Sequence, residues 1–227
     1  LEQNGMPTRL VLILDEVDRL LPASEVNPGF RGYADFFAYL RGVSQNSGGR
    51  FVTIITAANP VLCEQAMWEG RDNPIFQFYH LMFLPPLTRE DCNEMVVKLG
   101  RGMGIGYSEE SLETIFHATS GHPYITRLLC SQINQLNPSR PLQVTPDIVA
   151  RARNEFLRGE ATPIFSEILE RLDTFFPFER DLLLFIADGV DDEIELSRLV
   201  NQPVDVALYH LIGYQLVEQA EGKYRIK

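Results

Sequence analysis

Two adjacent carboxylates, Asp15 and Glu16, follow directly on an apolar run in this chain. The run, Leu10–Leu14, contains only Leu, Val and Ile, which is typical of a strand buried on both faces of a parallel sheet. Ligands of open α/β sheets bind beyond the carboxyl ends of the strands, so both carboxylates are expected at a ligand site. Carboxylates at such a place suit a magnesium ion and an attacking water.

The segment from residue 9 to residue 18 has the form of a Walker B motif. In such a motif Asp15 would hold Mg²⁺ and Glu16 would orient the water that attacks the γ-phosphate of ATP. A plainer alternative is that the pair caps a helix just past a buried strand. The companion motif G-x-x-x-x-G-K-[ST], whose backbone N–H groups cradle phosphates, does not occur in the chain. We therefore expect the chain to be the C-terminal part of a longer protein.

The composition is that of an ordinary globular protein, and it narrows the classes of partner. The 227 residues are 45% hydrophobic and 22% charged, with a net charge of −11. An acidic chain repels nucleic-acid phosphate unless a local basic patch overcomes its field. No apolar stretch reaches the length of about 18 residues that a membrane span needs. The cysteines, Cys63, Cys92 and Cys130, form neither a metal pattern nor a disulfide framework, so reduced thiols and a cytoplasmic location are expected.

Strands and helices alternate in the first part of the chain, which predicts a parallel α/β sheet. Besides the strand at 10–14, apolar and β-branched runs predict strands at 51–58 and 78–84, with helices at about 33–44 and 61–67. From Thr88 onward the pattern is helical. Thr88 and Asp91 form a predicted capping box, and helices beginning near residues 88, 108, 123 and 146 are expected to make a compact bundle. The glycines between residues 100 and 106 are interpreted as a connector between two of these helices.

The last part of the chain predicts a further module. An amphipathic helix at 163–172 leads to three helices at 178–187, 193–200 and 204–213, and then to two short strands around the turn Glu221–Gly222. Three helices followed by a β-hairpin are typical of a winged helix. The predicted domains are therefore a nucleotide-binding core at 1–87, a helical lid at 88–160 and a winged helix at 161–227.

Several short segments, taken in their order along the chain, resemble the STAND branch of the AAA+ ATPases. They are the Walker B segment, Thr53–Asn59, Asn73–Phe78, Leu84–Asp91 and Thr119–Tyr124. The resemblance covers nearly the whole chain. It implies an α/β fold in which part of a parallel AAA+ sheet, three strands here, precedes a helical lid and a winged helix. It also implies ATP or ADP with Mg²⁺ as ligands, and a role in signal transduction.

The same resemblance implies roles for the residues at the strand ends. Asp15 would bind Mg²⁺, and Glu16 would act on the attacking water. Thr56 or Asn59, at the tip of the second strand, would sense the γ-phosphate, although Asn59 could instead serve only to turn the chain.

In the lid, Gly121 and Pro123 would form the family's G-x-P motif and contact adenine or ribose, although Pro123 could instead only start a helix. The chain departs from the family where many members carry a sensor arginine, because Tyr124 and Ile125 stand there. Arg127, one turn later, is interpreted as a solvated surface residue. This departure favours a slow switch over a fast motor.

Two further residues, Arg71 and His210, could have a functional role, but each also has a simpler structural interpretation. Arg71 lies near the place where some AAA+ proteins carry an arginine finger for a neighbouring subunit, but a surface salt bridge is the alternative. His210 stands within a predicted helix between Tyr209 and Leu211, where a packing role is favoured.

We expect a regulatory nucleotide switch, in which the nucleotide state moves the lid and the winged helix and the output is a protein partner or an oligomer. The first alternative is a DNA-binding ATPase like the replication initiators. It is disfavoured because the predicted recognition helix at 203–213 has one acidic residue and no Lys or Arg. The second is a degenerate AAA+ scaffold that does not hydrolyse ATP. ATPase activity is expected of the intact protein. This fragment alone is expected to be inactive and to bind nucleotide weakly or not at all.

Overall fold

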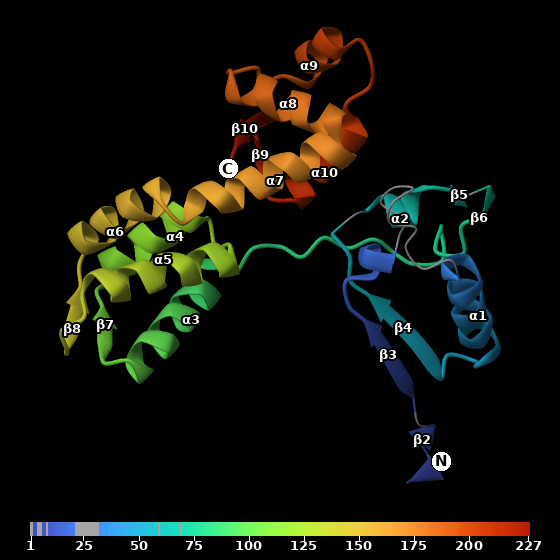
Figure 1. The fold of residues 1–227 in the computed structure, drawn as a ribbon, viewed down its shortest axis with the longest axis horizontal. Coiled ribbons are helices and arrows are strands. Elements are labelled where there is room, and N and C mark those ends of the chain that lie inside the picture. The colour runs from blue at the N-terminus through green and yellow to red at the C-terminus, as the bar shows by residue number, and fades with distance from the viewer. Residues whose placement is uncertain (1, 4–5, 8, 21–31, 59, 69) are drawn as a thin grey trace. The chain divides into compact units, whose positions relative to one another are not determined.

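The chain folds into two compact units in the computed structural model, Leu1–Met82 and Phe83–Lys227 (Figure 1). The structure describes residues 2–3, 6–7, 9–20, 32–58, 60–68 and 70–227. The first unit is a small α/β layer with one hydrophobic core, and the second is largely helical with two. None of the helices in the described ranges is long and apolar enough to cross a bilayer.

A pair of parallel strands forms the centre of the first unit. β3 (Leu10–Leu14) pairs with β4 (Phe51–Ile55) in an unbroken register. Helix α1 (Tyr33–Asn46) crosses between them and places its buried aromatic residues on one face of the sheet. The shorter elements of this unit are β1 (Glu2–Gln3), β2 (Met6–Pro7), the 3₁₀ turn η1 (Val17–Leu20), α2 (Val61–Glu64), β5 (Met67–Trp68) and β6 (Arg71–Asp72).

The prediction that strand 10–14 is buried on both faces is wrong for the part of the chain that the structure describes. Val11 and Ile13 of β3 are 51% and 63% exposed, and their register partners in β4, Val52 and Ile54, are 41% and 47% exposed. Side chains alternate between the two faces of a strand, and the core on the α1 side takes only the other set. The sheet therefore keeps one bare apolar face, formed by these four residues.

Residues 78–84, where a third strand is predicted, form no strand among the described residues. The N–H groups of Phe78 and Tyr79 donate to the carbonyl of Ile75 at 3.1 and 3.2 Å, which makes a turn at the start of this stretch. Tyr79 stays beside the sheet, because its hydroxyl lies 2.6 Å from Thr53 Oγ1. Tyr79 thus serves packing, whereas Met82 and Leu84 of the same stretch are exposed. The parallel sheet of the first unit has two described strands.

Four helices and a short parallel ladder make the first part of the second unit, residues 88–158, which we call the helical module. Its elements are α3 (Arg89–Gly102), β7 (Ile105–Tyr107), α4 (Glu109–Thr119), α5 (Pro123–Leu136), β8 (Leu142–Val144) and α6 (Pro146–Arg158). Thr88 and Ser108 cap α3 and α4, each accepting a backbone N–H three residues on. The stretch predicted as a connector contains β7, which pairs in parallel with β8.

Helix α7 (Ala161–Phe175) leads from the helical module to the last part of the chain. That part, which we call the C-terminal module, contains α8 (Pro177–Ala187), α9 (Glu193–Val200), α10 (Asp205–Gly213), β9 (Val217–Ala220) and β10 (Lys223–Ile226). The two strands are antiparallel, and Glu221 and Gly222 between them both have positive φ, as a tight hairpin turn requires. Its core residues form a hydrophobic cluster separate from that of the helical module.

Candidate functional site

The register of the parallel strands brings Asp15 and Thr56 to neighbouring positions just beyond β3 and β4. The ladder continues there, because Thr56 N–H donates to Leu14 O and Val17 N–H donates to Thr56 O, both at 2.9 Å. Thr56 Oγ1 donates to a carboxylate oxygen of Asp15 and accepts the N–H of Glu16 at 3.1 Å. Three of the predicted site residues therefore meet at the carboxyl end of the sheet.

Glu16 has an unusual backbone conformation for a residue with a side chain. Its φ of 54° lies in the left-handed region, and its N–H also lies 3.1 Å from Asp15 Oδ1. The Glu16 carboxylate contacts the Arg19 guanidinium through two pairs of atoms, at 2.9 Å to Nε and 3.1 Å to Nη2. Arg19 was not predicted as a site residue, although a spacing of three residues in a helical turn is a signal for such a pair.

The arrangement can bind a hydrated cation at an open surface. Asp15, Glu16 and Thr56 are all exposed. In the described part of the chain, no three His, Cys, Asp or Glu side chains are grouped so that they could hold a metal ion by themselves. One carboxylate beside a hydroxyl is a poor cage for Ca²⁺ or Zn²⁺ but fits Mg²⁺, which is commonly held by one or two carboxylates with water and substrate phosphate as its other ligands.

The prediction for Asn59 falls outside the described residues, so Thr56 is the candidate of this pair that the structure places. The chain beyond is fixed by Asn73, which is buried and was not singled out from the sequence. Its amide nitrogen donates to Leu62 O and Gln65 O at 2.8 Å each, and its oxygen accepts the N–H of Ile75 at 3.0 Å. Asn73 therefore shapes the segment that follows the strand tip.

Gly121 and Pro123, the predicted G-x-P motif, belong to the second unit. Gly121 has a φ of +72°, and a Cβ there would lie 2.3 Å from Leu87 O, so both backbone conformation and space require glycine. Pro123 is exposed and is the first residue of α5, whose N-cap is His122. The His122 Nδ1 atom accepts the N–H of Ile125 at 3.5 Å. Burial, followed by the nearby Lys227 cation, lowers the pKa of His122 below its usual 6.5.

Three other candidates fit their simpler interpretations. The Arg71 guanidinium forms an exposed ion pair with Asp35 at 3.5 Å. Arg127 is exposed on α5. His210 is buried at 3% exposure in the C-terminal module, where its Nδ1 lies 3.0 Å from Glu179 Oε1. The exposure of Arg71 and Arg127 favours surface roles for them, and the burial of His210 favours a packing role.

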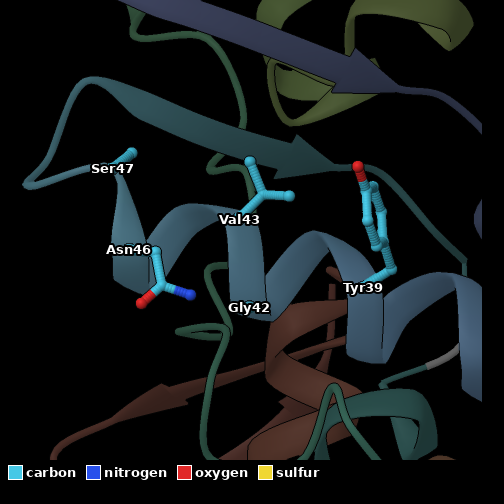
Figure 2. Close-up of a pocket in the computed structure, with 5 residues that line it drawn as sticks. All are labelled: Tyr39, Gly42, Val43, Asn46 and Ser47. Carbon is cyan, nitrogen blue, oxygen red and sulfur yellow. The ribbon is translucent and has the colours of Figure 1, made fainter.

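A shallow hollow of about 510 Å³ lies along α1. Tyr39, Gly42, Val43, Asn46 and Ser47 line it (Figure 2). The Ser47 hydroxyl is occupied within the backbone, since it donates to Ser44 O and accepts the N–H of Phe51. The hollow contains none of the predicted site residues and no charged group, so the strand ends remain the candidate functional site.

Comparison with known proteins places the fold. No protein-family model and no curated protein matches the chain. Among solved structures, the Walker-type ATPase Paby2304 of Pyrococcus abyssi matches with a TM-score of 0.62 and 17% identity, over 96% of this chain and 60% of that one. The RuvB Holliday junction branch migration motor of Thermotoga maritima matches with a TM-score of 0.46 and 14% identity, over 96% and 66%.

The chain therefore spans less than two thirds of the length of both of these structures. At 17% identity the match to the Walker-type ATPase shows the fold alone, and the more distant likeness to RuvB adds nothing to it. The described chain thus has a mixed α/β fold similar to part of a Walker-type ATPase.

Proposed function

We propose that this chain is part of a regulatory switch ATPase of the AAA+ type, of the STAND branch, that binds ATP or ADP with Mg²⁺. The observation that carries the proposal is the meeting of Asp15, Glu16 and Thr56 beyond two adjacent parallel strands. Ligands of open α/β sheets bind at this edge. The fold shared with a Walker-type ATPase supports the same function.

Each of the three residues has a proposed task in this site. The Asp15 carboxylate holds Mg²⁺, which when bound would neutralise phosphate charge. The Glu16 carboxylate orients the attacking water, for which it must leave the Arg19 guanidinium that it contacts in the structure. The Thr56 hydroxyl senses the γ-phosphate, for which it must turn from the Asp15 carboxylate, to which it donates in the structure, toward a phosphate oxygen. Asn59 remains the alternative sensor.

The coupling of nucleotide state to output is proposed to run through the remaining two domains. In this proposal residues 1–87 are the nucleotide-binding core, residues 88–160 the lid with Gly121 and Pro123 near the nucleoside, and residues 161–227 a winged helix. A ligand shifts such an equilibrium only by its difference in affinity for the two states, which γ-phosphate contacts would supply. The output would be the binding of a protein partner or the assembly of an oligomer.

The test is nucleotide binding and hydrolysis by the intact protein that contains this chain. Asp15→Asn should lose Mg²⁺-dependent ATP binding, measured by isothermal titration, because the metal carboxylate is gone. Glu16→Gln should keep that binding and lose hydrolysis by roughly a hundredfold or more, which is the usual contribution of a positioned proton acceptor. Unchanged turnover in the Gln variant would remove Glu16 from the proposed role.

The control is Asp72→Asn, which removes an exposed carboxylate of β6 outside the Walker B segment and should change neither binding nor hydrolysis. Residues 1–227 alone, without a phosphate-binding loop, should bind ATP weakly or not at all. Micromolar affinity of this fragment would contradict the expectation that an upstream loop makes most of the phosphate contacts.

A further inference from the structure

The first residue of the second unit, Phe83, is held by an aromatic contact. The ring of Phe83 packs edge-on against Tyr209 and Tyr214 at the end of α10, with ring centroids 5.4 and 5.7 Å apart and interplanar angles of 74° and 88°. Edge-to-face pairs at these separations are attractive beyond the area they bury. Phe83 is half-buried, whereas its neighbours Met82 and Leu84 are exposed.

The contact has a built receiving site on the C-terminal module. A Cβ at Gly213 would lie 2.5 to 2.6 Å from three carbons of the Phe83 ring, so the ring occupies the space that a side chain would need. Beside it, Gln215 has a φ of 62° and its amide nitrogen donates to Leu84 O at 2.9 Å. We call Tyr209, Gly213 and Tyr214 the Phe83 socket.

At Leu87 the chain is held by the helical module. Leu87 N–H donates to Gly121 O at 2.9 Å, and Leu87 O fills the space where a Cβ of Gly121 would be. We call residues 83–87 the tether. One end of the tether packs against Gly213 of the C-terminal module, and the other end packs against Gly121 of the helical module.

Among the described residues the two modules share no hydrophobic core, although Lys227 of the C-terminal module lies near His122 of the helical module. Their hydrophobic cores are separate clusters, and α7 is the covalent connection between them. Phe165 and Leu169, in the middle of α7, are exposed and contribute no core contact there. A single helix fixes the distance between two modules better than it fixes their relative orientation. A second connection is therefore needed to fix the angle between them.

We propose that the tether is this second connection, and that Phe83 in its socket fixes the orientation of the C-terminal module on the helical module. The tether follows directly on the first unit, so a pull on it would move the Gly121 loop and α10 together. The link to nucleotide rests on the proposed function, but the docking of Phe83 does not.

The experiment measures the orientation between the modules in residues 1–227 without nucleotide. Spin labels on ketone-bearing amino acids at Glu110 of α4 and Arg198 of α9, both exposed, leave the native cysteines unchanged. We expect one narrow distance distribution between the labels in the wild-type chain. Phe83→Ala should lose that narrow peak, whereas the matched control Leu84→Ala, which removes the adjacent exposed side chain, should keep it.

A second pair of variants separates docking from general damage to the fold. Gly213→Ala should also lose the narrow peak, because its Cβ meets the Phe83 ring. In the Phe83→Ala background the same change should have no further effect, since the clashing ring is gone. A narrow peak retained in both Phe83→Ala and Gly213→Ala would overturn the proposal. Because no nucleotide is present, this outcome is distinguishable from failure of the ATPase proposal.

Discussion

At the residue level, the histidine that caps α5 should make the stability of the chain depend on pH. The pKa of His122 is lowered by burial and by Lys227, so near neutral pH the folded state binds fewer protons there than the unfolded state. This contribution to stability is therefore complete above about pH 6.5 and decreases as the pH falls through the lowered pKa. Protonation of Nδ1 would also remove the acceptor for Ile125 N–H.

The substitution His122→Asn should flatten this dependence, since an asparagine oxygen caps a helix without titrating. The measurement is the free energy of unfolding in urea between about pH 7.5 and 5.5, the range in which histidine changes charge. Ser131→Asn, at an exposed position on the same helix, adds a side-chain amide without removing a titratable group, so it serves as the control and should leave the slope unchanged. Equal slopes in the wild-type and His122→Asn chains would contradict the argument.

The site residues could be predicted as far as the strand register determines them. In two parallel strands with Leu14 opposite Ile55, the next residues, Asp15 and Thr56, must be neighbours. The contact between Glu16 and Arg19 could not be foreseen, because it depends on the left-handed turn by which the chain leaves β3. That conformation is set by the backbone bonds around Thr56, which no local pattern encodes.

At the level of elements, two helix caps of the helical module offer a matched comparison. The Thr88 hydroxyl accepts the N–H of Asp91 at 3.1 Å and donates to its carboxylate at 2.8 Å, whereas the side chain of Thr145, the N-cap of α6, makes no capping bond. Thr88→Ala should lower the free energy of unfolding by about 1 kcal/mol, the usual cost of losing a cap. Thr145→Ala should cost less, and equal losses in urea denaturation would show that the cap is not the cause.

Helices were predicted better than strands because their signals are local. The caps at Thr88 and Ser108 and the proline that begins α6 are read from a few neighbouring residues, and these helices begin where expected. The ladder of β7 with β8 joins residues far apart in the chain, so its glycine-rich first strand looked like a connector. Residues 78–84 have strand composition but no described partner strand, and composition alone does not supply one.

The sheet of the first unit allows a test of its bare face with one kind of substitution. Ile54 and Ile55 are neighbours in β4, but Ile54 lies on the bare face and Ile55 packs against the core beside α1. Ile55→Thr should lower the free energy of unfolding by about 1–2 kcal/mol, because apolar surface is lost from the core. Ile54→Thr should stay within about 0.5 kcal/mol, as surface changes usually do. An equal cost in chemical denaturation would mean that the second face is covered in solution.

At the level of the whole molecule, the charge distribution argues against DNA as the partner of the C-terminal part. Residues 161–227 contain six Lys and Arg against thirteen Asp and Glu. Two of the cations in the hairpin are already paired, Lys223 with Asp191 at 2.8 Å and Arg225 with Glu218 at 2.5 Å. A groove reader needs free cations for phosphate and donors for base edges, and α10 carries no Lys or Arg.

Residues 1–227 should therefore show no binding to a fluorescently labelled DNA duplex in anisotropy titrations at low salt, where phosphate attraction is strongest. The charge-reversal variants Asp191→Lys and Glu218→Lys free the two hairpin cations and add two more. They test whether removing the negative charge allows DNA to bind. If the acidic field is what excludes DNA, the double variant should gain weak binding that disappears as salt is raised. Salt-dependent binding by the wild-type chain would instead restore the initiator-like alternative and weaken the case for a protein partner at this end of the molecule.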